Sequence, residues 1–358
     1  MIVDTIQKSE PQPSIIRLGI LGCGAITREK HLPIAMSHPD ILVSALVDAE
    51  VQRAELLKQV VGLTCRTSDD FRAILPETDA LIVAVPNYLH VPVTTEVLRA
   101  NVNVLCEKPL AIDADGARQC CAAADESGKL LAVVAPRRFY GSTLLMSALL
   151  EEERFGTVKS YDWENGVPFE WRNATNFLFQ KEFSGGGVLV DEGVHFLDIL
   201  QNWFGPATCL SYHDDNWGSG VEANALVELE HEGRHGRIRG SLKLSRTYEL
   251  KNRLLVHGDR ATAEIRRSDA DRVYLHLDLQ GRRVISAYEL PTLSNEPNDP
   301  FYCQLDNFVR AIQGTAKLTV DGMVALKTIE LIENCYKSAQ RFPEPWLEVD
   351  PIGVEKAR

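Results

Sequence analysis

Three side chains in the segment 184–198 have types and spacing suited to proton transfer. Asp191, His195 and Asp198 are spaced i, i+4 and i+7, so a helix here would present them on one face. A carboxylate one turn from an imidazole can fix its tautomer and raise its basicity, as a general acid/base requires. The same spacing also fits a structural His–Asp pair. Half a metal site is a third interpretation, but no further ligands stand at metal spacing.

The residues around this segment predict that the helix is buried. It is expected near Gly187 to Phe204, and apolar residues occupy most of the rest of its circumference. A polar stripe on a buried helix must have partners or line a cavity. The segment therefore predicts either an internal polar network or a lined site.

Lys108 is a further candidate for the chemistry. It stands in Cys106-Glu107-Lys108-Pro109, directly after an apolar segment from Val102 that predicts a buried strand. Ligands of open parallel sheets bind at the carboxyl edge of the strands, so Lys108 is expected to face a cofactor cleft. The alternative is an exposed loop lysine, the commoner fate of this residue type. At the cleft its positive charge would stabilise a developing alkoxide.

A glycine-rich loop lies between the first predicted strand and the first predicted helix. Gly22 and Gly24 would let the backbone approach a pyrophosphate, and Ala25 and Ile26 open the helix whose N–H groups would face it. Thr27 takes the third position of the dinucleotide-binding fingerprint, which predicts looser packing of helix on strand. The alternative is a tight turn without a ligand.

Asp48 ends the second predicted strand, where a carboxylate can accept hydrogen bonds from an adenosine ribose. A 2′-phosphate would meet Asp48 with like charge, so NAD is expected in preference to NADP. Arg53 lies nearby and could turn to a phosphate, which is the argument for the opposite preference.

Five polar or aromatic residues precede the buried helix and could contact a substrate. Aromatic rings, amides and a guanidinium suit a polyol, but the tryptophans fit an apolar core equally well. These residues are Trp163, Trp171, Arg172, Asn173 and Asn176.

Two patterns of apolar and polar residues along the chain predict the helices and strands that position these residues. Up to about residue 135, apolar segments alternate with helical ones, which predicts right-handed βαβ units around a doubly wound parallel sheet. From about residue 137, polar and apolar residues alternate in successive segments, which predicts a mostly antiparallel sheet with one wet face. We expect an N-terminal extension over 1–14, a dinucleotide-binding domain over 15–136 and an α+β domain over 137–358.

Composition limits the classes of function. The chain has 358 residues, 45% hydrophobic and 25% charged, and a net charge of −12, which argues against nucleic acid or an anionic membrane as partner. Its eight cysteines form no C-x-x-C pair. The polar N-terminus lacks the apolar stretch of a signal peptide, so a reducing cytoplasm is expected.

The motifs together resemble those of the glucose–fructose oxidoreductase/inositol dehydrogenase (Gfo/Idh/MocA) family, over about Ile16 to Arg341. The matching features are the Gly22/Gly24 loop, Asp48, residues 85–90 (VPNYLH), Glu107-Lys108-Pro109, and glycines 185–187 leading to Asp191 and His195. The resemblance implies a Rossmann domain followed by an α/β domain whose large open-faced sheet mediates oligomers, dimers or tetramers.

The resemblance also implies roles for individual residues. Lys108 would contact the substrate hydroxyl, His195 would be the general acid/base, and Asp191 would contact substrate or orient the imidazole. The cofactor site would include Pro86, Asn87 and His90 at the nicotinamide, together with Glu107 and Lys108. Substrate contacts would come from Lys108, Trp171, Arg172, Asp191 and His195. Pro109 is often preceded by a cis peptide bond in this family.

The implied activity is hydride transfer between a nicotinamide cofactor and a secondary alcohol or ketone of a sugar, sugar derivative or cyclitol. Two alternatives remain open. One is a family variant in which transient oxidation cleaves a glycosidic bond and the cofactor is recycled. The other is a non-catalytic cofactor-binding sensor, against which the intact set of Lys108, Asp191 and His195 argues.

Overall fold

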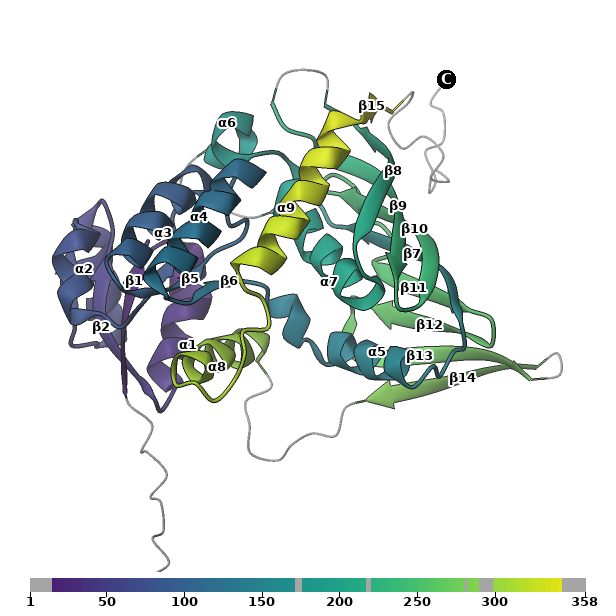
Figure 1. Cartoon of the computed structure of the whole chain (residues 1–358), viewed down its shortest axis with the longest axis horizontal. Coiled ribbons are helices and arrows are strands. Elements are labelled where there is room, and N and C mark those ends of the chain that lie inside the picture. The colour runs from purple at the N-terminus through teal and green to yellow at the C-terminus, as the bar shows by residue number, and fades with distance from the viewer. Residues whose placement is uncertain (1–14, 171–175, 217–219, 280–281, 290–298, 343–358) are drawn as a thin grey trace, which may run out of the picture.

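Two β-sheets with their helices make up the two halves of the molecule (Figure 1). The computed structural model describes residues 15–170, 176–216, 220–279, 282–289 and 299–342. None of the helices described there is long and apolar enough to cross a bilayer.

The first sheet has six parallel strands in the order β3-β2-β1-β4-β5-β6, which confirms the doubly wound prediction. The order reverses between β1 and β4, and ligands of such sheets bind at the carboxyl ends of the strands beside this reversal. The strands are β1 (Ile16–Leu21), β2 (Ile41–Val47), β3 (Arg66–Ser68), β4 (Ala80–Val83), β5 (Asn103–Cys106) and β6 (Leu131–Val133).

Helices cover both faces of this sheet, which explains why its strands are apolar nearly throughout. One face packs against α3, α4 and the late helix α9, and the other against α1, α2 and the late helix α8. The helices are α1 (Leu32–Ser37), which continues a π-helical turn at Thr27–His31, α2 (Val51–Val61), α3 (His90–Arg99), α4 (Ala114–Ser127), α8 (Pro300–Ile312) and α9 (Gly322–Lys337).

The second sheet has nine strands in the order β14-β13-β12-β11-β7-β10-β9-β8-β15. Only the pairs β10–β7 and β15–β8 are parallel, so the prediction of a mostly antiparallel sheet is confirmed. The strands are β7 (Val158–Gly166), β8 (Ala207–Asp214), β9 (Asn224–Gly233), β10 (Gly236–Ser245), β11 (Arg253–Gly258), β12 (Ala261–Arg266), β13 (Asp269–Leu279), β14 (Arg282–Glu289) and β15 (Ala339–Arg341).

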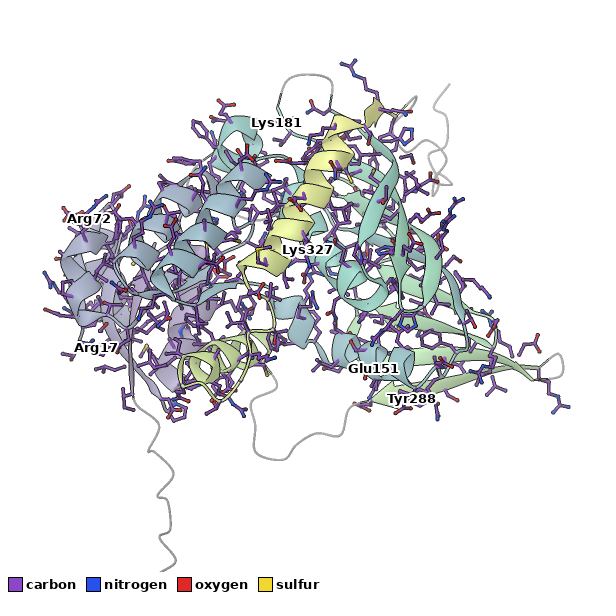
Figure 2. The ribbon with its side chains drawn as sticks, in the orientation of Figure 1. Arg17, Arg72, Glu151, Lys181, Tyr288 and Lys327 are labelled. Atoms are coloured by element: carbon purple, nitrogen blue, oxygen red, sulfur yellow. The ribbon has the colours of Figure 1, made fainter. Side chains whose placement is uncertain are left out.

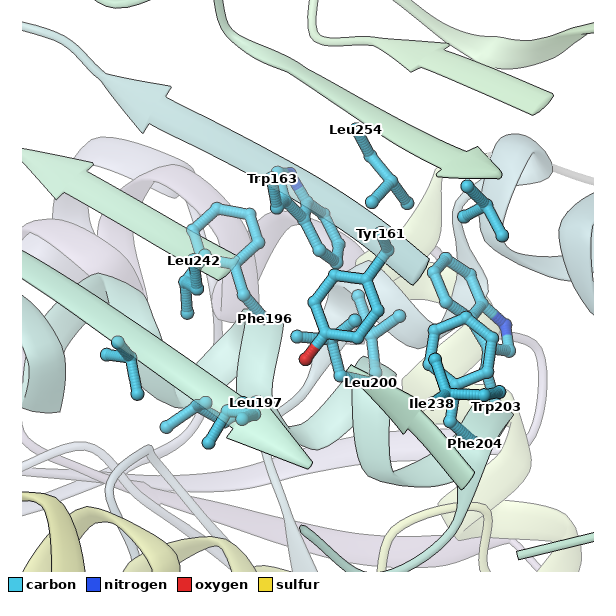
Figure 3. Close-up of a cluster of buried hydrophobic side chains, with 14 of the residues drawn as sticks. Tyr161, Trp163, Phe196, Leu197, Leu200, Trp203, Phe204, Ile238, Leu242 and Leu254 are labelled. Atoms are coloured by element: carbon cyan, nitrogen blue, oxygen red, sulfur yellow. The ribbon is translucent and has the colours of Figure 1, made fainter. Parts of the chain in front are cut away.

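Helices α5 (Gly141–Glu151), α7 (Val194–Phe204) and α9 lie on one face of this sheet (Figure 1). Aromatic side chains fill the space between α7 and the strands (Figure 3). The Trp163 ring lies edge-on to Phe196, with centroids 4.6 Å apart, and stacks on Trp203 at 6.1 Å. Trp163 is therefore a core residue, and its alternative interpretation as a substrate contact is wrong.

The opposite face of the second sheet is polar. On it, the side chains of neighbouring strands form ion pairs, such as Arg239 Nε to Glu230 Oε2 at 2.6 Å and His276 Nε2 to Glu264 Oε2 at 2.7 Å. Charged side chains also project from the outside of the first half, among them Arg17 and Arg72 (Figure 2). An apolar surface is therefore not what the open face of this sheet presents.

Helix α9 joins the two halves through its buried face. Ala325 and Ile329 belong to the core of the first sheet, whereas Leu331 and Ile332 belong to the core of the second. One continuous helix therefore packs against both cores, and the site described below lies between them.

Several elements of the second half differ from the expectation. The sequence from Tyr248 to His257 has the pattern of a strand, but β11 begins only at Arg253. Asn252 has a φ of 51°, and its side-chain amide donates to the main-chain oxygens of Gly166 and Leu250, at 3.0 and 2.9 Å. These bonds hold the preceding residues in a loop. The sequence also gave no prediction for β7, β8, β12 and α5.

Candidate active site

Lys108 and Asp191 meet across the boundary between the two halves. Lys108 follows β5, which ends at Cys106, and Asp191 lies in a π-helical turn, Leu189–Gly193, that leads into α7. The Lys108 ammonium donates to Asp191 Oδ1 at 2.6 Å and to the Asp191 main-chain oxygen at 2.9 Å. The peptide bond between Lys108 and Pro109 is cis, as the family resemblance implied.

The charges at this boundary fix the protonation of both partners. Burial alone would lower the pKa of Lys108, but the charges of Asp191 and Glu192 outweigh it and raise that pKa. Burial alone would raise the pKa of Asp191, but Lys108 and Arg246 outweigh it and lower that pKa. At neutral pH the pair is therefore an ammonium and a carboxylate.

Arg246 is a functional neighbour that the sequence did not reveal. It follows β10, is 8% exposed, and donates through its terminal nitrogen to Asp191 Oδ2. Its Nε is buried without a partner among the residues described. Nothing in the sequence distinguishes this arginine from others at strand ends, because only the fold brings it to Asp191.

His195 lies in the first turn of α7, and it lines a small cavity together with Lys108. No hydrogen-bond partner of its ring occurs in the part of the chain that the structure describes. Burial comes first, and the charges of Lys108 and Arg137 second, among the causes that lower the pKa of His195 well below its usual value. The imidazole is therefore neutral at physiological pH and can accept a proton.

The three polar residues of the predicted stripe do not bond to one another. Asp191 pairs with Lys108 and Arg246, and Asp198 accepts from Arg138 at 2.5 and 2.9 Å. Our interpretation that a carboxylate of this helix orients His195 is thus not what the structure shows. The reason is that both carboxylate oxygens of Asp191 are already engaged, Oδ1 by Lys108 and Oδ2 by Arg246.

Two adjacent arginines also reach this boundary. Arg137 donates to Glu192 at 2.9 Å and lies over the Phe196 ring, 4.5 Å from its centroid, while Arg138 holds Asp198. Both follow β6 at the carboxyl edge of the first sheet. Their position after a strand of the parallel sheet is the one sequence feature that could have indicated a role at the site.

The glycine loop has the geometry of a close-approach turn. Gly22 has a φ of 97°, and a Cβ there would overlap the Ala84 main-chain oxygen, so only glycine fits. Apart from the chain neighbours of Gly24, no atom of the described residues lies within 4 Å of a Cβ built there, so the backbone is open to a ligand. Ala25 and Ile26 follow, half-buried. These features fit the pyrophosphate of a dinucleotide.

The packing around Thr27 differs from the prediction. Its side chain is fully buried, and its hydroxyl donates to the Gly22 main-chain oxygen at 2.5 Å. The threonine therefore fastens the loop to the helix, where we expected looser packing.

Asp48 follows β2 directly and borders the glycine loop. Its Oδ2 accepts from the Cys23 N–H at 2.9 Å and its Oδ1 from the Glu50 N–H at 3.0 Å. Arg53 pairs with Glu50 at 2.8 Å. The carboxylate is thus held in place at the predicted ribose position, with the arginine side chain engaged elsewhere.

Three other predicted cofactor residues, Pro86, Asn87 and His90, lie at or after the turn that follows β4. Pro86 begins the turn after β4. Asn87 Nδ2 donates to the Ser184 main-chain oxygen at 2.9 Å, which ties this turn to the second half. The ring of His90 is 1% exposed, and its nitrogens lie 2.6 and 2.8 Å from the oxygens of Pro109 and Val85. We expected His90 to line the nicotinamide site; in the structure its buried ring lies against the loops that carry Val85 and Pro109.

Glu107 is a support residue of the same kind. Its carboxylate lies 2.8 Å from His31 Nε2 and accepts from the Lys108 N–H at 3.1 Å. Burial would raise the pKa of Glu107, but the bond to His31 and the charge of Lys108 hold it below its usual value. Trp171, Arg172 and Asn173, by contrast, lie outside the described residues, and Asn176 is exposed.

Comparison with known proteins places this geometry in a family. Residues 16–135 match the oxidoreductase family with an NAD-binding Rossmann fold, and residues 147–343 match the C-terminal alpha/beta domain of the same family. An inositol 2-dehydrogenase of Rhizobium meliloti is 24% identical over 342 residues, which are 90% of this chain and 96% of that protein.

Two further similarities concern a sugar-nucleotide relative and a solved structure. A putative UDP-kanosamine synthase oxidoreductase subunit of Amycolatopsis mediterranei is 32% identical over 196 residues, 54% of this chain. The match spans about half of that relative, 52% of its length. A levoglucosan dehydrogenase in complex with NADH and levoglucosan has the same fold, with a TM-score of 0.79 at 17% identity over 90% of this chain and 96% of its own. From the two domain matches, the chain belongs to the Gfo/Idh/MocA family of oxidoreductases.

Proposed function

We propose that this protein transfers a hydride between NAD and a secondary alcohol or ketone of a sugar, sugar derivative or cyclitol. The observation that carries the proposal is the meeting of Lys108 and His195, from opposite halves of the molecule, at one cavity. The inositol and levoglucosan dehydrogenases named above act on substrates of this class. The nicotinamide would supply the hydride acceptor or donor, and the protein supplies geometry and proton transfer.

His195 is the proton-transfer residue in this proposal. A neutral imidazole takes the hydroxyl proton when the alcohol is oxidised and returns it when the ketone is reduced. The lowered pKa of His195 keeps the ring in the form that oxidation needs. Its lack of a partner among the described residues leaves a ring nitrogen free for a substrate hydroxyl.

Lys108 supplies positive charge where the substrate oxygen becomes negative. Its raised pKa keeps it cationic, and the cation favours the alkoxide-like oxygen of the transition state. Asp191 fixes the ammonium by accepting from it, and Arg246 fixes Asp191 in turn. Trp171 and Arg172 complete the substrate-binding set that we propose.

Cofactor binding is proposed for the loop containing Gly22, Gly24, Ala25 and Ile26, with Asp48 at the ribose. Pro86 and Asn87 would border the nicotinamide, and His90 and Glu107 would hold the loops that carry it. Glu107 and His90 would thus contribute to cofactor binding indirectly, by holding these loops in place.

Self-association and cellular location are part of the same proposal. We propose a dimer or tetramer through the open face of the second sheet, held by ionic contacts because that face is charged. The eight cysteines are all free thiols, which supports a reducing cytoplasm.

A substrate screen tests the reaction directly. Sugars, cyclitols and nucleotide-linked sugars are offered with NAD, and the absorbance of reduced nicotinamide is followed. We expect at least one polyol to give steady formation of NADH. Product formation without net NADH would favour glycosidic-bond cleavage with cofactor recycling, and binding without turnover would favour the sensor.

A further inference from the structure

Glu222 is a buried carboxylate that the proposed reaction does not use. It lies in the segment before β9, is 2% exposed, and both its oxygens are bonded to other groups. Oε2 accepts from the Gly187 N–H at 2.9 Å, and Oε1 accepts from the Leu189 N–H at 3.0 Å and from the Tyr336 hydroxyl at 2.8 Å. No oxygen remains directed at the cavity of Lys108 and His195.

The main chain of Glu222 completes this contact. Its carbonyl oxygen accepts from the Val188 N–H at 2.9 Å. Three consecutive N–H groups, at residues 187, 188 and 189, therefore donate to one residue. The first N–H groups of a helix have no partner within the helix, so Glu222 satisfies the start of the helical segment that carries Asp191 and His195.

The glycines of residues 185–187 are explained by the same contact. A Cβ at Gly187 would overlap the main chain of Glu222, and a Cβ at Gly186 would overlap the Tyr336 hydroxyl. Gly185 has a φ of 86° and packs against Ile112 in the segment after Lys108. The glycine run thus permits Glu222 and Tyr336 to approach the helix start while the other side faces the Lys108 loop.

We propose that Glu222 is a positioning residue that sets the place of Asp191 and His195 relative to Lys108. The Asp191 N–H donates to the Gly187 main-chain oxygen at 3.0 Å, so the winding of the π-helical turn starts from the residue that Glu222 holds. A small displacement of this turn would move both side chains away from the other half. Misplacement of about 1 Å can cost about 100-fold in rate without any loss of the reacting groups.

The inference rests on the proposed function, so its test has one arm that needs no substrate. Amide hydrogen exchange is measured at residues 187–191 in the wild type and in three variants. Glu222→Ala removes all the side-chain bonds. Glu222→Gln keeps one carbonyl oxygen but sets an NH2 group against one N–H, and Tyr336→Phe leaves both N–H bonds in place. We expect faster exchange at residues 187 and 189 in Glu222→Ala and Glu222→Gln, and near wild-type exchange in Tyr336→Phe.

The second arm measures kcat, KM and the dissociation constant of NAD in the same variants. We expect kcat to fall about 100-fold in Glu222→Ala and about tenfold in Glu222→Gln. Tyr336→Phe should stay within about threefold of wild type, because its N–H bonds remain. Binding of NAD should change less than twofold in all three, because the glycine loop lies in the other half.

Each outcome decides the matter. A folded Glu222→Gln protein with wild-type kcat, or with unchanged exchange at 187 and 189, overturns the positioning role. Equal loss of kcat and of NAD binding would show general destabilisation and would overturn it too. If Glu222→Ala does not fold, Glu222→Gln and Tyr336→Phe still give the comparison. If the wild type oxidises no polyol, the proposed function fails while the exchange arm still decides whether Glu222 holds the helix start.

Discussion

The ammonium of Lys108 and the carboxylate of Asp191 lie 2.6 Å apart, across the boundary between the Rossmann half and the second sheet. Each residue is flanked in sequence by members of a different hydrophobic core, and each shifts the pKa of the other so that the charged form is favoured. The pair therefore serves two purposes, joining the halves and holding a cation beside His195.

Removing the charge of Asp191 should disturb Lys108 more than His195. We expect Asp191→Asn to lower kcat about 100-fold, because the ammonium loses the partner that fixes it. The free energy of unfolding should fall by about 1–3 kcal/mol, since two charge-assisted hydrogen bonds weaken. Kinetic assays and chemical denaturation measure both. Asp162→Asn, on the polar face of the second sheet, is the matched control; an Asp191→Asn enzyme as active as this control would refute the role of the pair.

The two directions of the reaction should depend on pH with opposite slopes. Because the pKa of His195 lies well below 6.5, the neutral ring predominates above that pH. Oxidation should therefore be independent of this group above about pH 6.5 and fall at acid pH. Reduction needs the protonated ring and should rise as pH falls toward the pKa. Profiles of kcat in both directions measure this, and an oxidation limb from His195 above pH 7 would contradict the lowered pKa.

NAD should bind more tightly than NADP. The carboxylate of Asp48 is fixed at the predicted ribose position, where a 2′-phosphate would meet like charge. Dissociation constants of both reduced cofactors measure the preference, and Asp48→Ser should reduce it. Arg53→Ala is the control, because Arg53 pairs with Glu50 and should leave the ratio unchanged. Tighter binding of NADP than of NAD by the wild type would contradict this prediction.

Self-association through the polar sheet face should depend on salt. Ion pairs exposed at such a face are screened as ionic strength rises, whereas apolar contacts are not. Sedimentation at micromolar protein should show a dimer or tetramer at about 0.05 M salt and partial dissociation at about 1 M. A monomer at both salt concentrations would remove the proposal, and an oligomer unaffected by salt would show that other contacts hold it.

The fold of the first half was largely predictable from local pattern, because the inner strands of a parallel sheet covered on both faces are apolar. The polar edge strand β3 lacks this pattern. The strands of the second half were harder to predict, since β10 ends and β11 begins at a loop held by contacts distant in sequence, such as Asn252 on Gly166.

The candidate site was likewise predictable only in part. Lys108, Asp191 and His195 stood out by motif, but their partners did not. Arg246 and Glu222 lie next to strands of the second sheet, and only the folded chain brings them to the helical segment that carries Asp191 and His195. The π-helical turn was also hidden, because an i, i+4 spacing is interpreted on α-helical geometry.

The central claim is that Lys108 and His195, from the two halves, act on one substrate. The most direct test measures both kcat and the dissociation constant of NAD in Lys108→Ala and His195→Ala. We predict that each variant loses about 10²–10⁴-fold in kcat and binds NAD within about twofold of wild type. Lys327→Ala, at an exposed lysine of α9 (Figure 2), is the control and should retain full activity. A His195→Ala enzyme with near-normal turnover and unchanged pH dependence would contradict the account and assign the proton to another group.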